Sequence, residues 1–149
     1  MSRLLDDDIR AQVVDFFAGL EHPVEVLFFG SDDPAKCEYC QETGQLLEEI
    51  TSLSDKLSLE IYDLVEDAEL ARQYKVDAAP SFVITGKDGG QLTDYGIRYK
   101  GVPAGHEFTS LVNSLLIVSK RDSGLSKETR EYLKTLVTPV ELQVFTTPT

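Results

Sequence analysis

The apolar residues at the start of the chain change from helical to strand-like spacing. Residues 6–20 place apolar side chains three and four positions apart, which predicts an amphipathic helix with one buried face. That face comprises Ile9, Val13, Phe16, Phe17 and Leu20. Residues 24–29 then form a nearly continuous apolar run (VEVLFF), which is typical of a strand buried on both faces. We therefore expect a helix followed by a central strand.

A helix, a strand and a second helix follow at lengths that fit a parallel crossover. Apolar spacing predicts a helix from about residue 37 to residue 53, and Gly44 inside it suits close packing of this helix on a sheet. Alternating polarity predicts a strand over residues 59–63, and residues 66–74 predict a short helix. A strand–helix–strand unit of this size implies a parallel pair of strands with a right-handed crossover.

The next segment predicts an antiparallel strand pair and a further helix. Residues 82–85 and 92–99 have strand character, and Lys87-Asp88-Gly89-Gly90 between them has the chemistry of a hairpin turn. After a loop at residues 101–105, a helix presents one apolar stripe. The stripe comprises Phe108, Leu111, Val112, Leu115 and Val118. We therefore predict an α/β fold, with a mixed four-stranded sheet flanked by helices, over residues 1–119.

The C-terminal part of the chain repeats its beginning. Residues 23–29 (PVEVLFF) and 139–145 (PVELQVF) are identical at four of seven positions, at an offset of 116 residues. Residues 120–149 are therefore expected to form a linker, a helix (126–136) and a strand (140–145) that open a second, truncated unit. A strand separated from its own sheet is expected either to pack on the first unit or to self-associate with another chain through its free edges.

Composition excludes several classes of function. The chain has 149 residues, of which 42% are hydrophobic and 27% charged, as in ordinary globular domains. It has no apolar run of transmembrane length, and its N-terminus lacks the apolar core of a signal peptide, so we expect a cytoplasmic protein that does not act at membranes. A net charge of −12 disfavours contacts with phosphates, so we expect no nucleic-acid partner.

The candidate chemistry lies at Cys37 and Cys40, the two cysteines of the chain. A C-x-x-C motif beside a βαβ pattern indicates redox chemistry. A zinc site would need about two ligands besides the cysteines, and the two histidines, His22 and His106, lie far apart in the sequence. We expect no metal and no cofactor other than a redox-active Cys37–Cys40 disulfide. In the first turn of a helix, Cys37 would be stabilised as a thiolate, which predicts Cys37 as the nucleophile and Cys40 as the resolving thiol.

Residues beside the cysteines are predicted to modulate this chemistry. Lys36 stabilises a Cys37 thiolate, whereas Glu38 destabilises it through like-charge repulsion, and both effects are modest at an exposed position. Tyr39 is predicted either to shield the cysteine pair or to provide a contact surface for the substrate.

The motifs together resemble the thioredoxin and glutaredoxin superfamily. A C-x-Y-C motif after a buried strand and an Ala79-Pro80-Ser81 sequence before the third strand carry this resemblance. In that superfamily a cis-proline faces the cysteine pair and the adjoining backbone pairs with the substrate. The resemblance therefore implies that Ala79 and Pro80 contribute to substrate binding beside Cys37.

The tandem layout narrows the resemblance further. Together with residues 101–108 (GVPAGHEF) and 144–149 (VFTTPT), it resembles the N-terminal unit of the glutaredoxin-like protein disulfide oxidoreductases of thermophilic archaea and bacteria. This resemblance implies a second C-x-Y-C directly after Thr149. It also implies a thiol–disulfide oxidoreductase that acts on protein disulfides through a mixed disulfide and receives electrons from a thioredoxin reductase-like flavoenzyme.

Two alternative functions and one departure from the family follow from the sequence. The alternatives are a glutathione-dependent glutaredoxin and a redox-inert interaction module with the same fold. The Gly89-Gly90 pair with Asp94 resembles a glutathione site, but it is expected at the wrong end of the fourth strand.

Thioredoxins carry a buried aspartate on the strand before the cysteines, whereas Val26-Leu27-Phe28 holds no acid, so the sequence identifies no proton acceptor for Cys40.

Overall fold

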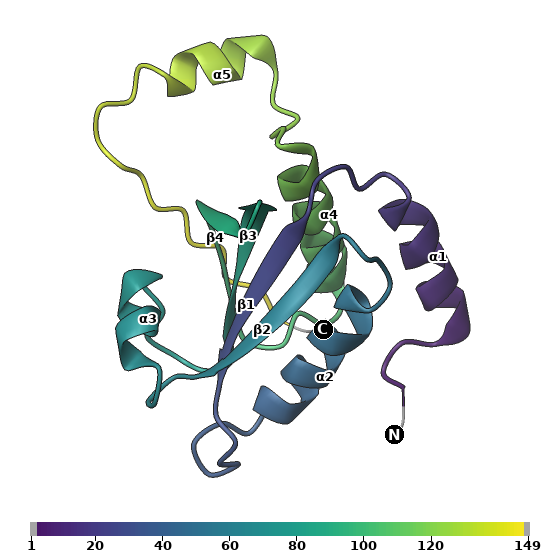
Figure 1. The fold of residues 1–149 in the computed structure, drawn as a ribbon. Coiled ribbons are helices and arrows are strands. Elements are labelled where there is room, and N and C mark those ends of the chain that lie inside the picture. The colour runs from purple at the N-terminus through teal and green to yellow at the C-terminus, as the bar shows by residue number, and fades with distance from the viewer. Residues whose placement is uncertain (1–2, 148–149) are drawn as a thin grey trace.

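The computed structural model describes residues 3–147 as one four-stranded sheet with helices on both faces (Figure 1). In chain order the elements are α1 (Asp7–Phe17), β1 (Val24–Gly30), α2 (Cys40–Thr51), β2 (Leu57–Asp63), α3 (Ala68–Gln73), β3 (Ser81–Asp88), β4 (Gln91–Lys100), α4 (His106–Lys120) and α5 (Lys127–Leu133). Within residues 3–147, every helix falls short of the length and hydrophobicity that a membrane crossing requires.

The sheet has the strand order β2-β1-β3-β4, with β1 in a central position. β1 runs parallel to β2 and antiparallel to β3, and β3 runs antiparallel to β4. Gly89 and Gly90 adopt positive φ angles of 58° and 86° in the turn between β3 and β4. The structure therefore confirms the predicted parallel pair, the hairpin and the mixed sheet.

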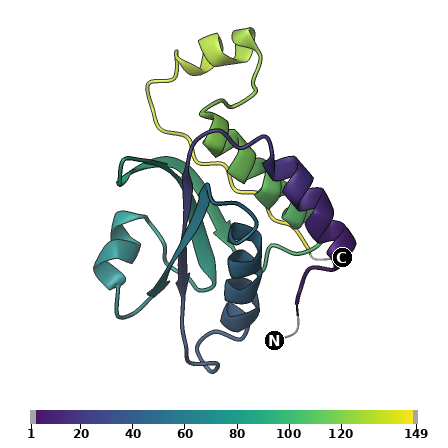
Figure 2. The ribbon, with the colours of Figure 1, turned by 45° about the vertical axis from the view of Figure 1, so that its right-hand side comes forward.

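The side chains of β1 alternate between two hydrophobic cores. Val24, Val26 and Phe28 belong to the larger core, which contains residues of α1, α2 and α4. Leu27 and Phe29 belong to a smaller core on the α3 side of the sheet. Figure 2 shows α3 on one face of the sheet and α2 and α4 on the other. All seven residues of β1 are buried, which confirms the strand predicted from the apolar run.

The helix α1 buries a narrower stripe than its sequence predicted. Val13, Phe17 and Leu20 are buried, whereas Ile9 and Phe16 are 39% and 41% exposed. The prediction of one five-residue buried face is therefore wrong for Ile9 and Phe16. The physical reason is the position of α1 at the outside of the helical layer, where only one side of the helix contacts the core (Figure 1).

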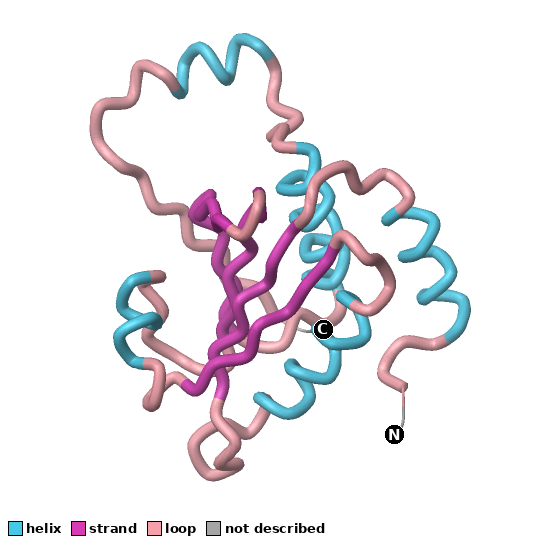
Figure 3. The backbone as a smooth tube through the Cα atoms, in the orientation of Figure 1, coloured by secondary structure: helices cyan, strands magenta, loops and turns pink. Residues whose placement is uncertain are grey.

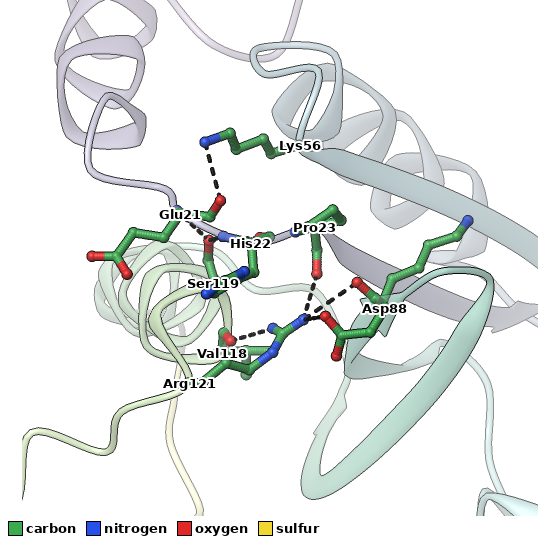
Figure 4. A network of polar contacts seen from close by, with 9 residues as sticks. Glu21, His22, Pro23, Lys56, Asp88, Val118, Ser119 and Arg121 are labelled. Carbon is green, nitrogen blue, oxygen red and sulfur yellow. Dashed lines mark hydrogen bonds and ion pairs between the residues drawn. The ribbon is translucent and has the colours of Figure 1, made fainter.

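A network of polar contacts joins the end of α4 to the start of β1 (Figure 4). The Ser119 hydroxyl accepts the backbone N–H of Glu21 at 2.8 Å and donates to the carbonyl of His22 at 2.7 Å. The Arg121 guanidinium donates to the carbonyls of Val118 and Pro23 and to the carboxylate of Asp88. These contacts fix the point at which the chain leaves the sheet domain.

The segment after α4 contains the predicted helix but not the predicted strand. α5 lies within the predicted residues 126–136 and buries no side chain. Residues 140–145 are drawn as loop in Figure 3, and their apolar side chains are 65–89% exposed. The expected strand at these residues is therefore wrong, because no described strand pairs with the segment through the backbone hydrogen bonds of a sheet. The division into units at residues 119 and 120 remains a prediction, and Pro148 and Thr149 lie outside the described residues.

Candidate active site

Cys37 and Cys40 form a disulfide. Their sulfur atoms are 1.97 Å apart and their Cα atoms are 5.4 Å apart. This is the disulfide that the C-x-x-C motif predicted. In residues 3–147 no group of three or more His, Cys, Asp or Glu side chains is arranged to hold a metal ion.

The disulfide lies in the connection between β1 and α2. The backbone N–H of Cys37 donates to the carbonyl of Asp33 at 3.1 Å, so a turn precedes the first cysteine. α2 begins at Cys40, with Tyr39 in the N-cap position. The expectation that Cys37 occupies the first turn of the helix is therefore wrong. Cys37 lies on the N-terminal side of α2, where unpaired helical N–H groups favour negative charge.

Both cysteines are buried against the end of the central strand. Cys37 is 6% exposed and Cys40 is 4% exposed, and both belong to the larger hydrophobic core. A Cβ atom added at Gly30 would lie 3.3 Å from the Cys40 sulfur and 2.9 Å from the ring of Phe28. The absence of a side chain at Gly30 therefore lets the sulfur pack on the end of β1. The sequence predicted the strand only to residue 29 and gave Gly30 no role, although a glycine directly after a buried strand was the available signal.

The peptide bond between Ala79 and Pro80 is cis, as the resemblance implied. Ser81, the next residue, opens β3 opposite Phe29 of β1. Pro80 therefore lies at the end of the sheet from which the chain leads to Cys37. Ala79 is partly buried and packs against the core that contains both cysteines. The role of these two residues and of Tyr39 in substrate binding remains a prediction.

The residues that flank the disulfide are exposed. Lys36 lies 4.0 Å from the carboxylate of Asp33, a distance at the limit of an ion pair. Glu38 is exposed, and Tyr39, between the cysteines, is 50% exposed. The structure therefore leaves the side chains of Lys36, Glu38 and Tyr39 available to a partner, and their modulating and binding roles remain predictions.

The glycine pair lies at the opposite end of the sheet. Gly89 and Gly90 connect Asp88 to Gln91, whereas Ser81 pairs with Lys100 near the disulfide. Asp94 forms an ion pair with Arg98, with a closest oxygen–nitrogen distance of 2.6 Å. The hydrogen bond from Arg98 lowers the pKa of the Asp94 carboxyl. Asp94 is therefore engaged within β4, and the glycines form a turn.

One buried acid was not predicted from the sequence. Glu25 is 6% exposed in β1 and accepts hydrogen bonds from Lys87 and, at 3.0 Å, from the hydroxyl of Ser58. The hydrogen bond to Glu25 raises the pKa of the Lys87 ammonium group. Glu25 lies at the start of β1, and Cys40 packs at the end of this strand, so Glu25 is not placed to accept a proton from Cys40. A single acid within an apolar run was the signal for its burial.

The chain is similar in sequence to subunits of alkyl hydroperoxide reductases and in structure to a protein disulfide oxidoreductase. No family model matches it. The alkyl hydroperoxide reductase protein AhpF of Escherichia coli (strain K12) is 39% identical over 113 residues, which cover 76% of this chain and 18% of that protein. An NADH dehydrogenase of Bacillus subtilis (strain 168) is 33% identical over 132 residues, which cover 88% of this chain and 22% of that protein. The chain thus spans about a fifth of the length of these curated relatives.

Two solved structures share the fold at higher coverage. A protein disulfide oxidoreductase from Aeropyrum pernix K1 has a TM-score of 0.75 and 29% identity, covering 90% of this chain and 57% of that chain. The NTD_N/C domain of alkylhydroperoxide reductase AhpF from Enterococcus faecalis (V583) has a TM-score of 0.74 and 27% identity. The match covers 85% of this chain and 58% of that chain. This sheet and these two structures show that the chain has a thioredoxin-like fold, and its C-x-x-C motif holds a disulfide.

Proposed function

We propose that the chain reduces disulfides of protein substrates through Cys37 and Cys40. The Cys37 thiolate attacks one sulfur of the substrate disulfide, forms a mixed disulfide and releases the other substrate sulfur as a thiolate. The Cys40 thiolate then attacks the Cys37 sulfur and releases the second substrate sulfur. Two electrons pass to the substrate, two protons convert its sulfurs to thiols, and the Cys37–Cys40 disulfide remains. The observation that carries this proposal is the disulfide at the end of β1, directly before α2.

The surroundings of the two sulfurs support different roles for them. Cys37 lies in the loop, between the exposed residues Lys36 and Glu38. Cys40 is the first residue of α2, and its sulfur packs close to Gly30. The Cys40 sulfur is enclosed at the end of β1, whereas Cys37 adjoins exposed residues, which supports Cys37 as the nucleophile and Cys40 as the resolving thiol.

The proposal extends to the partners of the site. Ala79 and Pro80 lie at the same end of the sheet as the loop of Cys37, which supports a role for them in holding an extended substrate segment. We propose that a thioredoxin reductase-like flavoenzyme reduces the Cys37–Cys40 disulfide again. The similarity to the AhpF proteins of alkyl hydroperoxide reductases supports a reductase-like partner. A cytoplasmic location belongs to the same proposal.

The proposal also includes a second unit that opens after residue 119. The buried side chains of Val24, Val26 and Phe28 in β1 correspond in the repeat to Val140, Leu142 and Val144. The first three are at most 4% exposed, whereas the second three are at least 65% exposed. An apolar strand pattern that is buried in one copy and exposed in the other supports residues 120–149 as the beginning of a second sheet. The C-x-Y-C expected directly after Thr149 lies outside the described residues.

A trapping experiment tests the assignment of the two cysteines. The reduced Cys40→Ser variant is incubated with a disulfide-bonded protein substrate, and covalent adducts are resolved by non-reducing electrophoresis and mass spectrometry. We expect a stable mixed disulfide at Cys37, because the resolving thiol is missing. The Cys37→Ser variant is the matched control and should trap little substrate. Equal trapping by both variants would contradict the roles, and unreactive thiols in the wild-type chain would favour the redox-inert module.

A coupled assay separates this function from that of a glutathione-dependent glutaredoxin. The oxidised chain is mixed with glutathione, glutathione reductase and a protein disulfide. We expect inefficient turnover, because Asp94 is paired with Arg98 and the glycine pair lies at the far end of the sheet. Turnover comparable to that supported by a dithiol reductant would instead favour the glutaredoxin function.

A further inference from the structure

A surface hollow lies between the two loops that leave the disulfide end of the sheet. It is lined by Ser31, Asp32, Asp33 and Lys36 of the β1–α2 loop and by Asp63, Val65 and Glu66 after β2. The two loops meet because β1 and β2 are parallel and end together, with Gly30 opposite Asp63. The N–H of Leu64 also donates to the carbonyl of Gly30 at 2.9 Å. Lys36, in the wall of the hollow, directly precedes Cys37.

Two acids in the lining of the hollow, Asp63 and Asp33, accept hydrogen bonds from the backbone of their own loops. The Asp63 carboxylate accepts the backbone N–H groups of Val65 and Glu66 at 2.8 Å and 3.0 Å. These bonds lower the pKa of the Asp63 carboxyl, so Asp63 is ionised at neutral pH. The Asp33 carboxylate accepts the N–H of Ala35 at 3.0 Å. Each of these two acids thus fixes the loop that bears it.

The other two acids of the hollow are free to meet a partner. Among the residues described, neither Asp32 nor Glu66 has an ion-pair partner, and both side chains are exposed. Lys36 is the single basic residue in the lining, against four acids. The positive charge of Lys36 is also shared with Asp33 at 4.0 Å. The hollow therefore keeps a net negative charge beside Cys37.

An apolar side chain completes the lining. Val65 is 66% exposed, although it is a branched hydrophobic residue, and it lies in the β2–α3 connection. Together with the half-exposed Tyr39 between the cysteines, it offers apolar contact area at the disulfide end of the molecule. Exposed apolar area of this kind packs against the aliphatic part of a long polar side chain.

From this lining we infer that the hollow binds the polypeptide that flanks the substrate disulfide, and that it selects flanks carrying lysine or arginine. The inference rests on the proposed function, since it names the substrate class of the same site. The aliphatic part of a lysine or arginine side chain can lie on Val65 while its charge faces Asp32 and Glu66. Complementary charge at the rim of such a contact acts mainly on the association rate.

Three synthetic peptides test the inference. Each contains one intramolecular disulfide, and they differ only in two flanking residues, which are arginines, glutamines or glutamates. The reduced chain is mixed with each peptide, and the second-order rate of peptide reduction is followed by chromatography. We expect the arginine peptide to react about tenfold faster than the glutamate peptide at low salt. Raising the salt from about 0.05 M to about 0.5 M should remove most of the difference, because exposed charges are screened.

Matched variants locate the effect at the hollow. The double variant Asp32→Asn/Glu66→Gln should reduce the ratio of the arginine rate to the glutamate rate about threefold. The control Asp15→Asn/Glu128→Gln removes the same charge from exposed positions on α1 and α5, and it should keep the wild-type ratio. Equal loss of selectivity in both double variants would assign the preference to the net charge and overturn the inference.

The failure of this inference is distinct from failure of the proposed function. If the wild-type chain reduces all three peptides at similar rates, the redox function stands and the selectivity does not. If it reduces none of them, while dithiothreitol reduces all, both proposals are overturned.

Discussion

Glu38 is the acidic residue that follows the proposed nucleophile in the chain. It is exposed and forms no ion pair among the residues described, so its charge is not neutralised by a neighbour. We expect Glu38→Gln to raise the thiolate fraction of Cys37, with an increase of about twofold in its alkylation rate at pH 7. A more stable thiolate favours the reduced form, so the disulfide of the variant should also be the stronger oxidant. Iodoacetamide kinetics and redox titration measure the two effects.

The same substitution at the far end of α2 is the control for Glu38. Glu48 is also exposed, and it lies in the last turns of the helix that begins at Cys40. Glu48→Gln should leave the alkylation rate of Cys37 unchanged, because a screened surface charge acts only over a short range. An unchanged or lower rate in Glu38→Gln would show that Glu38 does not oppose the thiolate.

At the scale of elements, the four strands of the sheet and the redox pair were predictable from the sequence. The apolar run of β1 and the glycines of the β3–β4 turn are local signals, and each element formed where its signal lay. The C-x-x-C spacing likewise predicted the disulfide, and the resemblance to the thioredoxin and glutaredoxin superfamily implied the cis peptide before β3. These features depend on residues that are close together in the chain.

The features that the sequence did not predict depend on tertiary neighbours. The start of α2 at Cys40 follows from the turn that holds Cys37 to Asp33, which apolar spacing does not reveal. The close approach of Gly30 to the Cys40 sulfur exists only once α2 lies on the sheet. The burial of Glu25 likewise requires Lys87 and Ser58 from two neighbouring strands.

Arg121 connects the end of α4 with the residue before β1 and with the end of β3. The position of its side chain depends on a glycine in β3. A Cβ atom added at Gly86 in β3 would lie 2.9 Å from Cζ of Arg121 and 3.0 Å from the ring of Tyr95. The Arg121 side chain is 20% exposed and reaches the carbonyl of Pro23 and the carboxylate of Asp88. Gly86→Ala should therefore destabilise the fold mainly by displacing the guanidinium group from these acceptors.

A double-mutant cycle measures this coupling. Urea unfolding should show a loss of about 2 kcal/mol for Arg121→Ala and about 1 kcal/mol for Gly86→Ala. In the Arg121→Ala background, Gly86→Ala should cost much less, with a coupling of about 1 kcal/mol. Alanine keeps the unfavourable φ of 55° at position 121, so the backbone contribution does not change. Additive losses would show that contact with Tyr95, not Arg121, explains the requirement for Gly86.

The whole molecule combines a well-packed sheet domain with a C-terminal segment that lacks a core. α5 buries no side chain, and Leu142 and Val144 are 88% and 83% exposed. A net charge of −12 opposes association of the chain with itself, but exposed apolar side chains in alternation favour strand pairing. At sufficient protein concentration, the apolar segment should outweigh the repulsion, particularly in high salt.

Charge placed within the exposed segment should abolish this association. We expect the wild-type chain to self-associate in sedimentation experiments as protein and salt concentrations rise, whereas Leu142→Asp/Val144→Asp should remain monomeric. The stability of the sheet domain should change by less than about 0.5 kcal/mol, because neither side chain contributes to its cores. The control Gln12→Glu/Asn113→Asp adds the same charge at exposed positions on α1 and α4 and should still associate. A wild-type chain that stays monomeric throughout would show that the segment does not pair with a second copy.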